Sequence, residues 1–361
     1  MLSKNIIHFF QLESYQFPGF FKTIKRNFKH SILPFLLVFL FVTLLYYIRL
    51  NSVVSLLLFI LLCYFIFIKT NIKSAKKPLI FTGRVKRLIL VYTIVLSLSM
   101  VVLIKYGACV YGFVFAIPIF IMAALLAWPI EKIISEFYFQ DAKSKLNSIP
   151  NLIRIGITGS YGKTTVKNIL AHILNQYTPT LMSPKSFNTP MGITITIRNM
   201  LSEHYRIFLA EMGSRHLGDI KELCRLVSPN IGIISSVGAQ HLDTFKSIEN
   251  VKKGKYELIQ CLPKDGHGFF QDDNAIVREL YQQTSIHKTL VSLYDENADV
   301  YVNNIIMSAK GSSFNIRFPN QEELSCNTAL LGEINIKNIA LSAAVAHFLK
   351  VPHSIIKKGI Q

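Results

Sequence analysis

The stretch from Arg154 to Lys167 constrains the fold more than any other part of the chain. The apolar run before Thr158 is typical of a buried strand, Gly159 and Gly162 open a turn, and a helical pattern begins at Lys163. Strand, glycine turn, Gly-Lys-Thr and helix together form a phosphate-binding site, because backbone N–H groups and the positive helix end face the anion. We expect Lys163 to reach the terminal phosphates of a nucleotide and the following threonine to ligate Mg²⁺.

The spacing of this loop departs from the common pattern. G-x-x-x-x-G-K-[ST] requires a glycine where the chain has Ile157, so the loop from Gly159 is two residues tighter. An ordinary turn between a strand and a helix that happens to contain Gly-Lys-Thr would share these letters. The motifs that follow in the sequence favour the phosphate-binding interpretation.

The basic charge of the chain is unevenly distributed. Residues 1–150 contain 17 Lys and Arg against 4 Asp and Glu, whereas residues 151–361 contain 22 against 17. This bias argues against a nucleic-acid-binding globular domain and favours charges that flank membrane segments. The five cysteines are scattered without a C-x-x-C pair, so they indicate neither a zinc site nor a disulfide framework, and reduced thiols in a cytosolic compartment are expected.

Four apolar, charge-free runs predict a membrane module over residues 1–130. Each run is long enough, or nearly so, to cross a bilayer, which takes about 17–25 residues. Helices buried in a soluble core would show polar faces, and these runs show almost none. We therefore predict an α-helical module of four transmembrane helices, followed by a linker over 131–150 that is helical as far as Asn147. The predicted spans cover residues 31–48, 50–68, 88–104 and 106–130.

Lysines and arginines in the connections predict the orientation of these spans. The outer connections contain only Arg49 and Lys105, whereas basic residues cluster before the first run and between the second and third. By the positive-inside rule, the N-terminus and the middle loop are cytoplasmic, and an even number of spans returns the chain to the cytoplasm, where ATP is. We expect a multi-pass protein of the inner (cytoplasmic) membrane. The aromatic, basic segment 10–28 either lies along the inner leaflet or forms a solvated leader.

Residues 151–349 alternate between strand and helix patterns. This alternation predicts an α/β domain with a mostly parallel sheet and a site at the carboxyl ends of its strands. A small antiparallel meander follows over 300–330, and an Ala-rich helix is expected over 335–349. The other predicted strands are 152–158, 205–211, 231–237, 267–271 and 290–293, and the predicted helices are 162–176, 217–226, 248–261 and 275–281.

Four polar residues near the predicted strand ends are ambiguous when each is taken alone. Glu211 suits Mg²⁺, but a solvated carboxylate at a strand end is commoner. His241 follows a buried strand, where a histidine is more often structural than a ligand. Lys255 would ordinarily be a solvated helix charge and Asn188 a turn residue.

In combination and in this order, the motifs resemble the central domain of the Mur ligases, most closely the MurF type. That type adds D-alanyl-D-alanine to the UDP-muramoyl tripeptide. The resemblance covers about residues 150–361, whereas the transmembrane module takes no part in it. The matching segments are Gly-Ile-Thr-Gly-Ser-Tyr-Gly-Lys-Thr-Thr, Ser-Phe-Asn-Thr-Pro-Met-Gly, Glu-Met-Gly-Ser-Arg-His-Leu-Gly-Asp-Ile, Ser-Val-Gly-Ala-Gln-His-Leu-Asp and Gly-Lys-Tyr-Glu-Leu-Ile.

The resemblance implies an ATP-dependent amide-bond ligase of peptidoglycan precursor synthesis that acts through an acyl phosphate. It implies catalytic roles for Lys163, His241 and Lys255, and two Mg²⁺ ions held by Thr164, Glu211, His241 and Lys255. Lys255 matches the lysine that the family carbamylates with CO₂. His216 matches a histidine of the MurF-type motif without an assignable role. The implied ATP contacts are Gly159, Ser160, Tyr161, Gly162, Lys163, Thr164 and Thr165 in the loop, Asn188 beside the γ-phosphate, and Asn335 and Asn338 near the adenine.

The sequence departs from the family pattern at two nucleoside contacts. Ile334 replaces a histidine before the adenine segment, and Phe270 replaces the asparagine of Asn-x-Asp-Asp, which places base affinity in more doubt than phosphate chemistry. The usual UDP-sugar domain is not visible, and residues 350–361 match the start of a C-terminal domain, which favours a fragment.

The expected partners are membrane lipid, a UDP-muramoyl or lipid-linked peptide and an amino acid or dipeptide, without nucleic acid. A ligase for another polymer, such as poly-γ-glutamate, remains an alternative. A non-catalytic nucleotide-binding membrane scaffold is a second alternative. The intact Lys163, Glu211, His241 and Lys255 speak against the scaffold.

Overall fold

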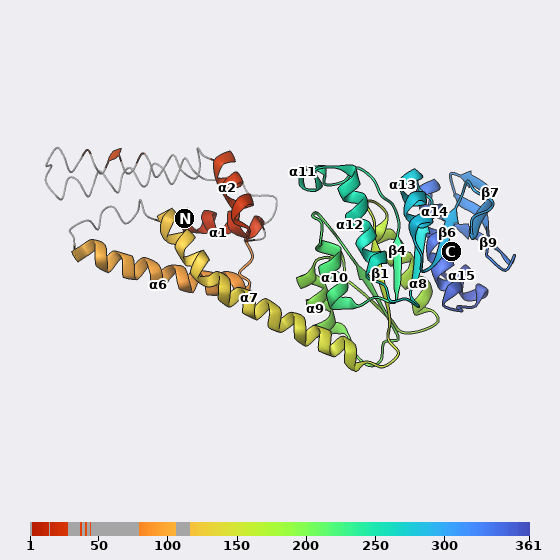
Figure 1. Cartoon of the computed structure of the whole chain (residues 1–361), viewed down its shortest axis with the longest axis horizontal. Helices are drawn as coiled ribbons and strands as arrows, with labels where there is room; N and C mark the ends of the chain where they lie inside the picture. Colours follow the sequence, from red (N-terminus) through yellow and green to blue (C-terminus); the bar gives the residue numbers. More distant parts are fainter. Residues whose placement is uncertain are drawn as a thin grey trace. The chain divides into compact units, whose positions relative to one another are not determined.

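A computed structural model of the chain describes residues 2–13, 15–27, 79–105 and 116–361, together with four single residues between 37 and 44 (Figure 1). The chain divides into two compact units, Met1–Ile134 and Ser135–Gln361. The boundary falls within one long helix, α7 (Ala116–Ser148). Each unit has its own apolar core.

The described part of the first unit consists of helices. These are α1 (Leu2–Leu12), α2 (Phe17–Arg26), α6 (Gly83–Lys105) and the first half of α7. Phe10 and Phe20 pack against Phe120 of α7 in a shared apolar core. The N-terminal segment is therefore packed, which overturns the solvated-leader alternative.

Two described helices, over Gly83–Leu103 and Ile117–Ser148, are long and apolar enough to cross a membrane. They contain the third predicted span and the described part of the fourth. Apolar side chains on α6, such as Leu98 and Val101, are about two-thirds exposed at 65% and 66%. The predicted spans 31–48 and 50–68 lie outside the described residues, so the prediction of four transmembrane helices is confirmed only as two candidate helices.

The second unit is built on a nine-stranded sheet with the order β2-β3-β1-β4-β5-β6-β7-β8-β9. The pairs from β2 to β7 are parallel, and β7, β8 and β9 form an antiparallel meander. The predicted mostly parallel α/β sheet is therefore confirmed. The strands are β1 (Ile153–Thr158), β2 (Thr180–Met182), β3 (Ile207–Glu211), β4 (Ile231–Ile234), β5 (His267–Gln271), β6 (His287–Ser292), β7 (Val300–Ser308), β8 (Gly311–Arg317) and β9 (Glu323–Thr328).

Helices cover both faces of this sheet (Figure 1). One face packs against α8, α14 and α15, and the other against the end of α7 and α9, α10, α12 and α13. The central strands are consequently apolar on both sides, as expected for a parallel sheet. The helices are α8 (Lys163–Asn175), α9 (Pro190–Met200), α10 (Asp219–Val227), α11 (Leu242–Phe245), α12 (Ile248–Gln260), α13 (Ala275–Gln283), α14 (Glu333–Phe348) and α15 (His353–Ile360).

The segments at the two ends of this unit are parts of its core. Residues 131–148 are helical, as expected, but they are more than a linker, since Phe139, Ala142 and Leu146 are buried against α9 and α10. At the other end, Ile356 and Ile360 of α15 join the core formed with α8 and α14. Residues 139–149 and 353–360 therefore contribute buried surface to the α/β unit.

Candidate active site

The glycine loop joins the end of β1 to the start of α8. Gly159 has φ +154° and Gly162 has φ +80°, which side chains rarely adopt. A Cβ atom on Gly159 would lie 2.2 Å from the Ser235 Oγ, and one on Gly162 would lie 2.8 Å from the Asn338 Oδ1. Both glycines are thus required by close approach as well as by backbone conformation.

Hydrogen bonds to the segment after β4 fix the shape of the loop. The Ser160 amide donates to the Ser236 carbonyl at 2.9 Å, and the Tyr161 amide donates to the Ser236 Oγ at 2.7 Å. The first helical hydrogen bond of α8 runs from the Val166 amide to the Gly162 carbonyl. The amides of residues 163–165 precede that ladder and can donate to a bound anion, as the sequence predicted.

Lys163 lies over this loop. Its Nζ donates to the Gly159 carbonyl at 2.6 Å and to the Ser160 carbonyl at 3.2 Å. Burial lowers the pKa of Lys163, and the negative charge of Glu211 partly offsets that effect. The ammonium group is therefore held at the place where phosphates would bind.

Glu211, at the end of β3, is the centre of a buried polar cluster and is 1% exposed. Its carboxylate accepts hydrogen bonds from the Thr164 hydroxyl at 3.0 Å, the Lys167 Nζ at 3.0 Å and the Asn188 Nδ2 at 3.2 Å. Its own amide donates to the Ser183 hydroxyl at 3.1 Å. Two of the other predicted residues, Thr164 and Asn188, therefore meet at the Glu211 carboxylate.

Lys167, the cation of this cluster, is not among the site residues predicted from the sequence. Lys167 is completely buried, and it also donates to the Lys185 carbonyl at 2.6 Å. The signal was present in the helix pattern, because Lys167 falls on the same buried face as Val166 and Leu170. A lysine on an apolar helix face requires a buried partner.

Lys255 of α12 is also buried, at 1% exposed. Its Nζ donates to the Ser214 hydroxyl at 2.9 Å. Burial, reinforced by the positive charge of Lys163, lowers the pKa of Lys255 to about 7. At neutral pH, the Lys255 amine is therefore neutral, and so nucleophilic, in a large fraction of the molecules.

His241 is exposed, with φ +55° at the N-terminus of α11. Partial desolvation of the ring, followed by the positive charges of Arg215 and Lys255, lowers the pKa of His241. The neutral imidazole, which is the form that ligates metals, is therefore favoured. His216 is exposed, with its Nδ1 3.8 Å from an Asp219 carboxylate oxygen. The charge effects of Lys163 and Lys255 on His241 place these three residues in one electrostatic environment.

A cavity of about 100 Å³ lies between the glycine loop and the start of α14. Asn338 lines it, but Asn335 does not, and the Asn335 Nδ2 donates to the Leu331 carbonyl at 2.7 Å. Only one of the two predicted adenine contacts therefore faces the cavity. The lining residues are Tyr161, Gly162, Ser235, Ser236, Gln271, Asp273, Ile334, Lys337 and Asn338.

Gln271 is the polar residue that β5 directs to this cavity. It is 2% exposed, and both atoms of its side-chain amide have no partner among the described residues. Phe270, which the sequence analysis took for a changed nucleoside contact, instead packs on the opposite face of the sheet against Tyr281. The structure therefore corrects that expectation, because neighbouring residues of a strand face opposite sides.

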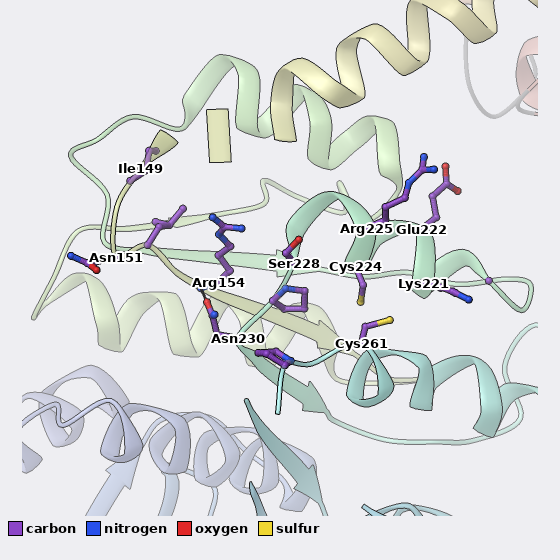
Figure 2. A pocket seen from close by; sticks show the side chains of 14 residues that line it. Ile149, Asn151, Arg154, Lys221, Glu222, Cys224, Arg225, Ser228, Asn230 and Cys261 are labelled. Carbon is purple, nitrogen blue, oxygen red and sulfur yellow. Dashed lines mark hydrogen bonds between the residues drawn. The ribbon is translucent and has the colours of Figure 1, made fainter. Parts of the chain in front are cut away.

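A larger cavity of about 1080 Å³ lies at the amino ends of β1 and β4, away from the glycine loop (Figure 2). Its lining includes Arg154, Asn230 and the thiols of Cys224 and Cys261. The neighbouring Cys224 lowers the pKa of the Cys261 thiol. None of the predicted site residues lines this groove, so the candidate active site is the one at the carboxyl ends of the strands.

A glycine loop after a parallel strand, a lysine over it and a carboxylate beside the first helical threonine define a nucleotide-binding protein of the P-loop class. The family model "Mur ligase middle domain" matches residues 157–346, which is more than half of the chain. The chain belongs to the Mur ligase family.

Relatives and solved structures agree with this assignment. The UDP-N-acetylmuramoyl-tripeptide--D-alanyl-D-alanine ligase of Buchnera aphidicola subsp. Baizongia pistaciae is 29% identical over 64% of this chain and 51% of its own length. The ligase of that name from Escherichia coli K12 is 27% identical over 66% of this chain and 54% of its own length. A crystal structure of MurF from Acinetobacter baumannii is 25% identical, with a TM-score of 0.57, and the match covers 63% of this chain and 49% of that one. The chain thus spans about half the length of the relatives it matches.

Replacing Gln271 with leucine should raise the dissociation constant for ATP by about tenfold, which corresponds to about 1.4 kcal/mol. The carbonyl oxygen of a glutamine amide accepts a hydrogen bond and its NH₂ group donates one, which matches the amino group and the ring-nitrogen acceptor on the edge of adenine. Equilibrium binding of a fluorescent ATP analogue to the full chain measures the change. Phe270→Leu serves as the control, because that side chain faces away from the cavity. Equal affinity of the wild type and Gln271→Leu would remove Gln271 from base recognition.

Proposed function

We propose that this protein is an ATP-dependent ligase that joins a carboxylate to an amine through an acyl phosphate in peptidoglycan precursor synthesis. The observation that carries the proposal is the meeting of Thr164 and Asn188 at the Glu211 carboxylate, beside the glycine loop that Lys163 covers, with the low-pKa amine of Lys255 in the same electrostatic environment. This arrangement can bind phosphates and a divalent cation in one place.

The residues present fit both ATP and Mg²⁺. Gly159 and Gly162 leave room where a Cβ atom would collide with neighbouring residues. The unpartnered Gln271 amide lines the cavity between the glycine loop and the start of α14, where we place the nucleoside. The Thr164 hydroxyl lies 3.0 Å from the Glu211 carboxylate, which gives the oxygen donors that Mg²⁺ prefers. Thr164, Glu211, His241 and Lys255 are the residues that would hold Mg²⁺, with Lys255 contributing oxygen only as a carbamate. When bound, Mg²⁺-ATP supplies the activated phosphoryl group for the carboxylate.

The chain's own residues position and stabilise this reaction. Lys163 neutralises charge on the transferred phosphoryl group, and the first amides of α8 hold its oxygens. Asn188, fixed by Glu211 at 3.2 Å, lies on the same side of the loop. The donors are already in place before the substrate arrives, so little reorganisation is required at the moment of transfer.

For the substrates, we propose UDP-muramoyl tripeptide and D-alanyl-D-alanine. The relatives' names, quoted above, motivate this choice. The exposed apolar surface of α6 motivates a second candidate, a lipid-linked form of the same acceptor. In both cases residues 1–130 act as a membrane module, the α/β domain of residues 151–349 is cytoplasmic, and α6 and α7 cross the inner membrane.

Release of phosphate from ATP by the full, detergent-solubilised chain tests the proposal. Release should require both UDP-muramoyl tripeptide and D-alanyl-D-alanine, and it should fall to background in Lys163→Ala. ATP binding without stimulation by these substrates would argue for the lipid-linked acceptor, which is then offered in mixed micelles. Absence of stimulation by either acceptor would contradict the proposed activity.

A further inference from the structure

Three potential metal ligands meet at the edge of the α/β unit far along the chain from the glycine loop. Glu322 lies in the turn between β8 and β9, His347 in the last turn of α14, and His353 at the start of α15. The His347 Nδ1 is 3.0 Å from the His353 Nε2, which is 3.4 Å from the Glu322 Oε2. One ligand atom from each residue lies within 4.8 Å of the others.

These separations are those of ligands around one small cation. In a tetrahedral site with metal–ligand bonds of about 2.0–2.1 Å, neighbouring ligand atoms are about 3.3 Å apart. The two measured separations lie on either side of that value. The third pair, the His347 Nδ1 and a Glu322 carboxylate oxygen, lies within 4.8 Å, so rotation of the exposed Glu322 side chain would complete the arrangement around an ion.

The backbone around the three residues is well fixed. Between α14 and α15, the Lys350 amide donates to the His347 carbonyl at 2.9 Å, and the Val351 amide donates to the Ala346 carbonyl at 3.0 Å. In the β8–β9 turn, the Phe318 amide donates to the Glu322 carbonyl at 2.9 Å. The site is therefore built on backbone that is already ordered, as metal sites require.

An aromatic wall orients the two imidazoles. The Phe318 ring stacks on His347 with centroids 4.2 Å apart and lies 5.0 Å from the His353 ring. Without a cation, one of the two facing ring nitrogens carries the proton of the hydrogen bond between His347 and His353, and a bound cation would take the place of that proton.

We propose that Glu322, His347 and His353 bind a divalent transition-metal ion, most favourably Zn²⁺, with water in the fourth position. Two imidazoles and one carboxylate suit Zn²⁺, whereas the Glu211 cluster offers the oxygen donors that Mg²⁺ prefers. The ion would tie the end of α14 and the start of α15 to the β8–β9 turn. Its role is structural, because these residues lie outside the nucleotide site.

The test measures Zn²⁺ binding to the full, detergent-solubilised chain without a polyhistidine tag. The protein is first treated with a chelator, and Mg²⁺-ATP is kept saturating so that the active site does not contribute. We expect one Zn²⁺ per chain, a rise in thermal midpoint with Zn²⁺, and visible absorption of tetrahedral type with Co²⁺. His353→Gln should raise the dissociation constant for Zn²⁺ by about 100-fold and remove the thermal shift.

Two further variants keep the result interpretable. Glu322→Gln changes an exposed side chain, so it should fold normally and still weaken Zn²⁺ binding by about tenfold. His204→Gln is the matched control, since His204 is an exposed histidine outside the cluster. Wild-type affinity in both His353→Gln and Glu322→Gln would overturn the proposal, as would the absence of Zn²⁺ binding by the wild type.

Discussion

Replacing Glu211 with alanine should lower the free energy of unfolding of the α/β unit by about 3–5 kcal/mol. The substitution leaves the Lys167 ammonium buried without its counter-charge, since the two side chains are 1% and 2% exposed and 3.0 Å apart. It also removes the acceptor for Thr164 and Asn188. Removing one partner of a buried ion pair costs far more than the net value of the pair, because the remaining charge stays desolvated.

A double-mutant cycle separates the unpaired charge from the other losses. Combining Glu211→Ala with Lys167→Met removes the stranded cation, so the double variant should regain most of the stability lost by Glu211→Ala alone. Urea-dependent pulse proteolysis of the full chain, with fragments of the α/β unit detected separately, measures the stability of this unit.

An ion pair whose carboxylate is exposed provides the control for the cycle. Glu279→Ala removes the partner of Lys252, and the Glu279 side chain is 58% exposed, so the loss should stay below about 1 kcal/mol. The explanation by an unpaired charge would be contradicted if the double variant lost as much stability as Glu211→Ala and Lys167→Met lose when their separate losses are added. Phosphate release should be absent from Glu211→Ala and from the double variant alike, which distinguishes the chemistry from the stability.

The alternation of strands and helices after residue 151 was predictable because local patterns encode it. Strands β1, β3, β4 and β5 begin within two residues of their predicted starts, and the glycine loop lies where the sequence places it. Strand β6 begins three residues before its predicted start, and β2 was not predicted. The direction of the strands followed from the intervening helices, since parallel strands require such crossovers. The position of the site at the carboxyl ends followed from that direction.

The burial of particular charges was not predictable in the same way. Lys255 resembles a solvated helix residue in sequence and is buried only because α12 packs beside the strand ends, whereas Lys167 was overlooked although it falls on the apolar face of α8. The error at Phe270 has a related cause. In a strand that is buried on both faces, apolar and polar residues do not alternate, so the sequence does not tell which side chain faces the cavity.

Helix α9 illustrates a conflict between local signals. Ile193, Ile195 and Ile197 alternate with threonines as in a strand, yet the segment is helical, and the sequence analysis predicted no helix there. The overlooked signal was the start, because the Thr189 hydroxyl accepts from the Gly192 amide and Pro190 occupies the first turn. Packing of Ile193 and Ile197 into the core then decides the outcome.

Replacing Lys255 with methionine should have opposite effects on stability and activity. In the unfolded chain a lysine holds its proton up to about pH 10.4, whereas burial lowers the pKa of Lys255 in the folded chain to about 7. Between these values the unfolded state binds more protons, so stability from this group rises with pH and the penalty is complete below pH 7. Lys255→Met should therefore stabilise the α/β unit by about 2–4 kcal/mol at pH 6.5 and by little at pH 10.

The same substitution should reduce phosphate release by about 10³-fold, because in the proposed function Lys255, as a carbamate, helps to hold the Mg²⁺ ion of Mg²⁺-ATP. The neutral amine can attack CO₂, forming an N–C bond and releasing one proton to give an anionic carbamate. Wild-type activity should accordingly increase with bicarbonate and with pH through about 7. Lys253→Met, at a side chain that is 63% exposed on the same helix, is the control for both measurements.

The stability and the phosphate release of Lys255→Met test two separate claims about this residue. A variant that is inactive but no more stable at pH 6.5 than at pH 10 would contradict the lowered pKa while leaving the catalytic role intact. A variant that is stabilised but fully active would contradict the catalytic role and with it the need for a carbamate. A buried lysine that costs stability at neutral pH is retained only if its chemistry is used, because an apolar side chain would stabilise the same space.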